Sequence, residues 1–163
     1  MRMIDVKACF EKNGFHNVST YIQSGNVLFG SDELDQTKLT SKVEDVLSAA
    51  FKYQSRVVVR SYSQMKAIVA RAPKGFGSDP AAYRCDVIFL KEPLTAAEAI
   101  KVVTPKAGVD EAFAGKGVLY FSRLTSRASE SRLSRVIALP VYQSMTIRNW
   151  NTTTKLLELM EMD

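Results

Sequence analysis

Two stretches of the chain share one plan, and this repeat limits the fold more than any other feature. Residues 18–29 have the pattern of two short strands joined by a tight turn at Gly25, and residues 110–121 repeat it around Gly115-Lys116-Gly117. Glycine suits such turns because it adopts a positive φ without strain. A helical pattern precedes and follows each stretch. The sequence therefore predicts one α/β unit used twice.

The first half has the order helix, strand, strand, helix, strand. Its last strand is predicted at residues 54–60, where Val57, Val58 and Val59 form the unbroken apolar run of a strand covered on both faces. A βαββαβ ferredoxin-like unit has this order with one more strand in front. That strand is central in such a sheet, and its absence would leave two unpaired edges. We therefore expect the opening strand of the first half to be missing from this sequence.

The second half contains the whole βαββαβ pattern. Its predicted elements are strands at 83–90, 110–121 and 145–148, and helices that open at Thr95, span 129–139 and open at Asn151. We predict an α+β protein of two ferredoxin-like halves, with antiparallel sheets that carry helices on one face. The first half covers residues 1–72, including a connecting helix with a capping box at Ser61. Residues 73–82, rich in glycine and proline, form a linker to the second half at 83–163.

Composition and charge exclude several classes of protein. The chain has 163 residues, of which 46% are hydrophobic and 24% charged, and no apolar run approaches the ~20 residues of a membrane span. No apolar leader follows Met1, so we expect a cytoplasmic protein. The two cysteines, Cys9 and Cys85, are too few for a disulfide scaffold and lack the spacing of metal ligands. The single histidine, His16, excludes a site built from several histidines, and we predict no metal or cofactor.

An enzyme is the less favoured class, because no catalytic motif is present. The sequence contains neither a phosphate-binding glycine loop nor a nucleophile elbow. Carboxylate pairs such as Asp110/Glu111 lie at the ends of predicted elements, where solvation or helix dipoles account for them. Asp86, within a predicted strand, needs a partner if it is buried. An enzyme would have to draw its polar groups from the missing opening segment and the loops.

The most unusual segment surrounds the only tryptophan of the chain. Arg148, Asn149, Trp150 and Asn151 precede a helix whose first N–H groups would favour an anion. Arginine and tryptophan also suit planar or phosphate-bearing ligands. A structural alternative explains the same residues as a tryptophan in the core, a helix cap at Asn151 and a surface arginine.

The first hairpin supplies the other part of a candidate site. Ser24 and Asn26 flank Gly25 in a turn that could present backbone N–H groups to an anion, although a plain turn has the same sequence. We predict a binding module for a small anionic or nucleotide-like ligand. The ligand site would form where the hairpin, the tryptophan segment and one further arginine converge. Its residues would be Tyr21, Ser24, Asn26, Arg123, Arg148, Asn149, Trp150 and Asn151.

A basic patch offers an alternative partner. Between residues 123 and 135, Arg123, Arg127, Arg132 and Arg135 face only Glu130, a local surplus of three positive charges (four minus one). Such a surplus is typical of a surface that attracts nucleic acid, whose binding then weakens steeply with salt. A solvated helix face with its leading loop explains the same charges. The sequence does not indicate an oligomeric state.

Two blocks near the ends of the chain resemble a known family. The matching residues are Tyr21–Phe29, preceded by Gly14, Phe15 and Val18, and Arg148–Thr152, followed by Lys155 and Leu156. They are similar to the bacterial family catalogued as domain of unknown function 1697. Members of that family begin with a strand and a Leu-Leu-Arg-Gly-Ile-Asn-Val-Gly-Gly stretch that this sequence lacks, in agreement with the missing strand. The resemblance implies a cytoplasmic bacterial protein with no established activity.

Overall fold

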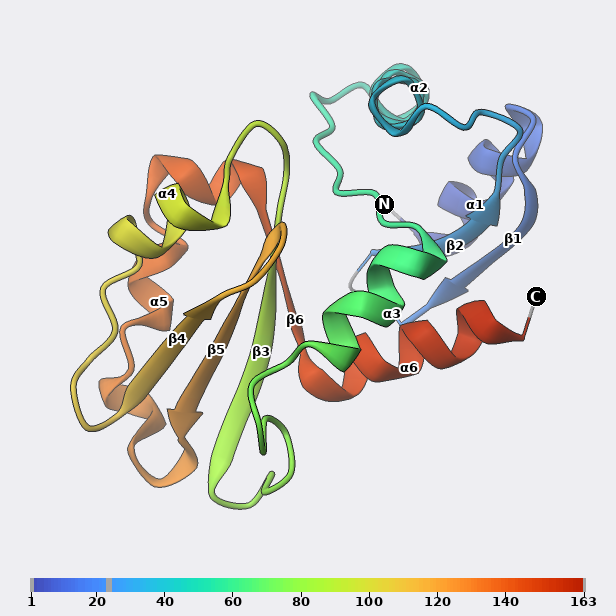
Figure 1. Ribbon diagram of the computed structural model, residues 1–163. Coiled ribbons are helices and arrows are strands. Elements are labelled where there is room, and N and C mark those ends of the chain that lie inside the picture. The colour runs from blue at the N-terminus through green and yellow to red at the C-terminus, as the bar shows by residue number, and fades with distance from the viewer. Residues whose placement is uncertain (1, 23–24, 163) are drawn as a thin grey trace. The chain divides into compact units, whose positions relative to one another are not determined.

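The computed structural model describes residues 2–22 and 25–162, which divide into two compact units (Figure 1). Unit 1 comprises residues 1–59 with 159–163, and unit 2 comprises residues 60–158. Each unit has its own apolar core and its own antiparallel sheet. The protein is thus a mixed α+β structure, as predicted.

Unit 1 packs two helices with a two-stranded antiparallel sheet. Its elements are α1 (Met3–Lys12), β1 (His16–Tyr21), β2 (Asn26–Gly30) and α2 (Gln36–Phe51). Asp35 caps α2, and its carboxylate accepts a hydrogen bond from the Lys38 N–H at 3.1 Å. In the core, the rings of Phe10, Phe15 and Phe29 lie with their centroids 5.1 to 5.2 Å apart. The predicted first hairpin is therefore confirmed, with both helices sharing its core.

The strand predicted at residues 54–60 is wrong. This segment is irregular, and its backbone groups bond to side chains of α2: the Ser55 N–H donates to Ser48 Oγ at 2.9 Å and the Val57 N–H to Glu44 Oε2 at 3.0 Å. A strand needs a neighbouring ladder, and within the described residues none pairs with this segment. Val57 is accordingly half-buried instead of covered on both faces.

Unit 2 is built on a four-stranded antiparallel sheet with the strand order β4-β5-β3-β6. The central strand β3 pairs with β5 on one side and β6 on the other, and β4 pairs with β5. Its strands are β3 (Tyr83–Leu90), β4 (Asp110–Ala114), β5 (Val118–Leu124) and β6 (Met145–Asn149). Its helices are α3 (Tyr62–Ala70), α4 (Ala96–Val102), η1 (Thr125–Glu130), α5 (Leu133–Val136), η2 (Pro140–Ser144) and α6 (Trp150–Glu161), whose last turn belongs to unit 1.

Both faces of the unit 2 sheet are covered, whereas the sequence predicted helices on one face only. The first face carries Ile88 and Phe121, which pack with α4 and α5 and are fully buried. On the second face, the Tyr120 hydroxyl donates to the Ile68 carbonyl of α3 at 2.7 Å. Both sets of alternating residues on β3 and β5, one for each face, therefore contain buried apolar side chains. Val87, on the second face with Tyr120, is an example because it is fully buried.

The helix predicted at residues 129–139 is interrupted. The structure has only a short α5 there, flanked by the 3₁₀ turns η1 and η2. One cause is Asp110, whose carboxylate accepts a hydrogen bond from the Arg132 N–H at the start of α5. Another is Pro140, which is the first residue of η2 and cannot donate a helical hydrogen bond. The capping boxes at Ser61 and Thr95 are both present as predicted.

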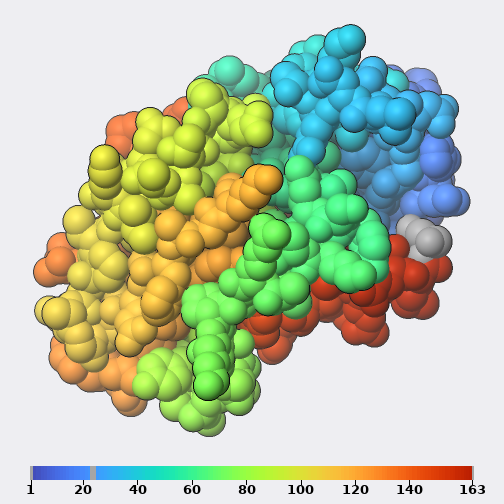
Figure 2. Space-filling view, viewed as in Figure 1, coloured from blue at the N-terminus to red at the C-terminus, as the bar shows by residue number. Residues whose placement is uncertain are grey.

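Arg60 holds the turn of the β4–β5 hairpin. Its Nη2 donates to the carbonyls of Leu90 at 2.6 Å and Gly117 at 2.9 Å. Figure 2 shows this turn, in orange, at the surface beside the green segment that begins unit 2. Among the described residues, no helix is both long and apolar enough to cross a membrane.

Candidate functional site

Charged side chains gather at one end of the first face of the unit 2 sheet. Arg123 on β5 is in register with Asp110 on β4 and with Arg84 on β3, and Asp86 lies two residues further along β3. Residues two apart on a strand share a face, and cross-strand partners have Cβ atoms about 4.5–5.5 Å apart. Thr125 follows Arg123 by two residues, at the start of η1. We call these five residues the sheet-end cluster.

Four buried side-chain polar atoms in the described part of the chain lack a hydrogen-bond partner, and all four belong to the sheet-end cluster. They are Asp86 Oδ2, Asp110 Oδ1, Arg123 Nε and Thr125 Oγ1. A buried polar atom without a partner costs about 1–3 kcal/mol, and native proteins keep few of them. A guanidinium donor, a hydroxyl and two carboxylate oxygens are thus buried at this end of the sheet without hydrogen-bond partners among the described residues.

The two carboxylate oxygens of Asp110 differ in their hydrogen bonding. Its Oδ2 accepts hydrogen bonds from the N–H groups of Lys106 and Arg132, each at 2.9 Å. This carboxylate therefore ties the loop before β4 to the start of α5. Its Oδ1 is buried and has no partner in the described residues.

Asp86 is buried, with 8% of its surface exposed, and this burial raises its pKa above the ordinary 3.8. The positive charges of Arg123 and Arg84 act in the opposite direction and lower the pKa. Desolvation is the larger effect, so the ionised carboxylate is less stable here than in water.

The raised pKa of Asp86 predicts a pH-dependent effect of Asp86→Asn. An acid with a raised folded-state pKa binds its proton more tightly when folded, so wild-type stability falls as pH rises from 3.8 through the folded value. The variant lacks this loss, so its stability relative to the wild type should increase as pH rises towards neutrality. Urea unfolding of both proteins between pH 3 and pH 7 measures the difference. A gain that shrinks as pH rises would contradict the assignment.

The basic patch predicted between residues 123 and 135 is divided in the structure. Arg123 lies half-buried in the sheet-end cluster, whereas the exposed Arg127 forms a two-bonded ion pair with Glu130 at 2.7 and 2.9 Å. This pairing involves the one negative charge already subtracted in the surplus of three. The structure lowers the surface charge of the patch only through Arg123, which is half-buried and in register with Asp110.

Arg148 and Arg123 lie on opposite faces of the sheet. Arg148 is in register with Val87, whereas Arg123 is in register with Arg84, and these two β3 residues have opposite parity. The Arg148 Nη1 donates to the Ile147 carbonyl at 2.9 Å, and burial lowers its pKa. The prediction that Arg123 and Arg148 converge on one ligand is therefore wrong, because the two side chains lie on opposite faces of the sheet.

The residues around Trp150 have structural contacts. The indole lies edge-on to the Phe76 ring, with centroids 5.1 Å apart, and packs directly against Gly77. Asn149 caps α6, because its Oδ1 accepts the Thr152 N–H at 2.8 Å. The cap therefore lies two residues before the predicted Asn151, which is exposed. These contacts match the structural alternative for Trp150.

The hairpin candidates belong to unit 1, whereas the arginines belong to unit 2. Tyr21 ends β1 in register with Asn26, whose side-chain amide donates to the Tyr21 carbonyl at 3.0 Å. This bond closes the hairpin, and Asn26 is buried. Ser24 lies outside the described residues.

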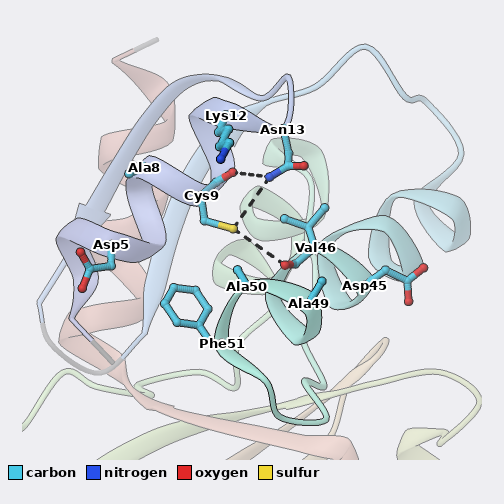
Figure 3. A pocket seen from close by; sticks show the side chains of 10 residues that line it. All are labelled: Asp5, Ala8, Cys9, Lys12, Asn13, Asp45, Val46, Ala49, Ala50 and Phe51. Atoms are coloured by element: carbon cyan, nitrogen blue, oxygen red, sulfur yellow. Dashed lines mark hydrogen bonds between the residues drawn. The ribbon is translucent and has the colours of Figure 1, made fainter.

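Unit 1 also contains a groove that the sequence did not reveal. It lies between α1 and α2, has a volume of about 690 Å³ and exposes Ala8 and Ala49 (Figure 3). Cys9 Sγ donates to the Val46 carbonyl at 3.9 Å, and burial raises the pKa of this thiol. Asn13 Nδ2 donates to the Cys9 carbonyl at 2.8 Å. The groove thus holds a neutral thiol, and none of the unpartnered buried atoms of the described residues lies in it.

Comparisons with known proteins agree with the α+β architecture. The model of a family described as "Protein of unknown function (DUF1697)" matches residues 1–120. A search among curated proteins found no match. The solved structure of the conserved bacterial protein SP0830 from Streptococcus pneumoniae is similar, with a TM-score of 0.85 and 21% sequence identity. The match covers 98% of this chain and 89% of that chain, and this likeness concerns the fold.

Proposed function

We propose a function from the chain's own residues, because the chain belongs to DUF1697, a family of proteins of unknown function. The proposed function is the binding of a small anionic, nucleotide-like ligand at the sheet-end cluster of unit 2. The observation that carries it is the gathering of four buried, unpartnered polar atoms at that one place.

The unused atoms define the chemistry of the ligand. The Arg123 Nε–H and the Thr125 hydroxyl are donors for an anionic group, and guanidinium bonds to phosphate or carboxylate are stronger than neutral ones. Asp86 Oδ2 and Asp110 Oδ1 are acceptors for ligand hydroxyl or amine groups. The two carboxylates offset the charges of Arg84 and Arg123, so an anionic group alone is not the best occupant. A ligand with an anionic group and several hydroxyl or amine donors, such as a nucleotide, uses all of these atoms.

The proposed site overlaps the sequence-predicted residues in part. Arg123 belongs to both, and Asn149 is in register with Asp86, which brings the tryptophan segment to the border of the cluster. Tyr21, Asn26 and Arg148 are not required by the proposal. Arg148, which lies on the other face of the same sheet, therefore serves as the matched control.

Arg123→Ala should weaken the stabilisation of the protein by its ligand. Loss of a charge-assisted hydrogen bond of about 1.5–3 kcal/mol corresponds to roughly a tenfold to hundredfold weaker affinity. Thermal unfolding with a panel of nucleoside mono-, di- and triphosphates, sugar phosphates and inorganic phosphate identifies the ligand class, and calorimetry then gives the affinities. Arg148→Ala should bind as the wild type does. The proposal fails if no compound raises the melting temperature, or if Arg148→Ala weakens binding as much as Arg123→Ala.

Two alternative functions, nucleic-acid binding and catalysis, have less support. Nucleic-acid binding through Arg123, Arg127, Arg132 and Arg135 has less support because Arg123 is half-buried in the sheet-end cluster and not fully at the surface. An enzyme would need a cleft beside a carboxylate with a raised pKa. Asp86 supplies the carboxylate, but the sequence offers no recognisable nucleophile and base pair to act with it, and its single histidine, His16, belongs to the other unit.

We also propose that the chain consists of two halves, residues 1–72 and 83–163, and that both follow one βαββαβ plan. The order β4-β5-β3-β6, antiparallel throughout, with α4 between β3 and β4 and α5 between β5 and β6, supports this plan for unit 2. In unit 1, α1, β1, β2, α2 and residues 54–59 follow in the corresponding order. The first half would then lack its opening strand, the counterpart of β3.

A further inference from the structure

We infer that two copies of this chain associate through the open edge of β4, so that their unit 2 sheets join into one antiparallel sheet across a twofold axis. The inference uses residues of unit 2 only and is independent of anion binding. A twofold interface uses the same surface on both copies, so the edge of β4 must be complementary to itself. Its hydrogen-bonding groups, its apolar residues and its charges all meet this requirement.

One edge of β4 is open. It is the outermost strand of the unit 2 sheet and pairs with β5 only (Figure 1). The Gly115 N–H donates to the Val118 carbonyl at 2.9 Å, and backbone groups alternate between the two edges of a strand. The odd-numbered residues of β4 therefore face β5. The N–H and carbonyl groups of Ala112 and Ala114 point away from it, and no other strand of the described residues pairs with them.

The opposite edge of the same sheet is protected, whereas the edge of β4 is not. The ladder between β3 and β6 leaves the carbonyls of Ile147 and Asn149 on that opposite edge. Side chains bond both of them: Arg148 Nη1 donates to the first and Thr153 Oγ1 to the second, each at 2.9 Å. Natural sheets use charges, prolines and bulges for the same purpose. Residues 112–114 of β4, with the sequence Ala-Phe-Ala, contain none of these.

The outward groups of β4 determine the register of two copies. Ala112 opposite Ala114 of the second copy, and Ala114 opposite Ala112, gives two hydrogen-bonded pairs that use every outward group of both residues. This register is symmetric about a twofold axis. A register shifted toward the start of the strand would use Asp110, whose N–H already donates to the Lys106 carbonyl at 2.8 Å.

The same register places Phe113 on the twofold axis. It then lies opposite Phe113 of the second copy in a non-hydrogen-bonded pair, where cross-strand side chains are closest. Phe113 is exposed, whereas Tyr120, its register partner on β5, is buried. Association would therefore cover an aromatic ring that the fold of one chain leaves in solvent.

The charges at the two ends of β4 select a second copy as the partner. Glu111 lies near the start of the strand and Lys116 lies in the turn beyond its end, and both are exposed. In the antiparallel register, Glu111 of each copy lies opposite Gly115 and next to Lys116 of the other copy. The two charges lie at opposite ends of β4 within one chain, so they attract each other only between copies.

The first test measures association of the full chain. Sedimentation equilibrium from micromolar to millimolar concentration should show the mass rise from 18.1 kDa toward twice that value. Over this range, hydrogen exchange of the Ala112 and Ala114 amides should slow about tenfold or more. The Glu111 and Phe113 amides, which face β5 in both states, should change much less. A chain that stays monomeric, or a dimer without protection of Ala112 and Ala114, overturns the inference.

Proline substitution tests the hydrogen bonds of the edge. Ala114→Pro removes an outward N–H and leaves the bonds to β5 in place, so it should abolish association. Ala114→Ser keeps the N–H and should associate as the wild type does. Circular dichroism shows whether each variant is folded. A folded Ala114→Pro protein that dimerises normally overturns the inference.

Charge reversal tests the register without changing the backbone. Lys116→Glu places like charges side by side at both ends of the interface and should weaken association by about tenfold, because each exposed pair contributes little and two are lost. Adding Glu111→Lys to the same chain restores opposite charges and should restore association. Failure of the double variant to recover the association lost in Lys116→Glu would overturn this register and the interface built on it.

Discussion

Replacing Phe121 by alanine should lower the free energy of unfolding by about 3–5 kcal/mol. Phe121 has no exposed surface and lies in the unit 2 core with Ile88, Leu119 and Val136. Removing a ring from a core enclosed by the sheet and its helices costs the transfer energy of the ring and leaves a cavity that neighbours cannot fill. Urea unfolding followed by tryptophan fluorescence measures the change.

Phe113→Ala is the matched control. Phe113 lies on β4 and has 39% of its surface exposed, so truncation there should cost much less, on the order of 1 kcal/mol. A loss at Phe121 no larger than the loss at Phe113 would show that the core of unit 2 does not have the packing described.

Gly77→Ala should destabilise the protein by about 2–5 kcal/mol. Gly77 has φ +77°, where an L side chain costs about 1–2 kcal/mol, and its Cβ would overlap the Trp150 indole. Forcing a methyl group into a filled space adds about 1–3 kcal/mol. Because Trp150 is the only tryptophan, its emission should shift in the folded variant.

Gly75→Ala separates the two effects of the Gly77 substitution. Gly75 has a similar φ of +80°, but its Cβ would meet only Ser78 Oγ, at an ordinary 3.6 Å. It should therefore show the backbone effect without the overlap. Equal losses at both glycines would mean that Trp150 does not occupy the space beside Gly77, and would return the indole to the candidates for ligand stacking.

The parts of the fold that depend on local physics could be predicted from the sequence. The glycine turns place both hairpins, and the capping boxes at Ser61 and Thr95 start their helices as expected. Each signal depends on a few adjacent residues, because a turn or a cap is completed within about four positions.

Features that depend on distant partners could not be predicted. Residues 54–60 have a strand-like sequence but no neighbouring strand, and α2 side chains bond them instead. The helix expected at 129–139 is interrupted where the Arg132 N–H donates a hydrogen bond to the carboxylate of Asp110, which lies 22 positions earlier in the chain. Such contacts have no local sequence signature.

The candidate site was predictable only in fragments. The sequence marked Asp86 as a charge that needs a partner and Arg123 as part of a basic patch. Their proximity follows from the register of three strands, and the same register places Arg148 on the opposite face. Thr125 carries no signal of its own, since a threonine after a strand is ordinary. Register is set by the whole sheet, so the site becomes visible only when the strands are paired.

The most direct test of the sheet-end cluster is the NMR signal of the Arg123 Nε–H during titration with a nucleoside monophosphate and, if that does not bind, with the other compounds of the panel. Binding should shift this signal and slow its exchange with water, while the Arg148 side-chain signals stay in place. No change at Arg123 with any compound, or a change at Arg148 alone, would contradict the assignment of the ligand site.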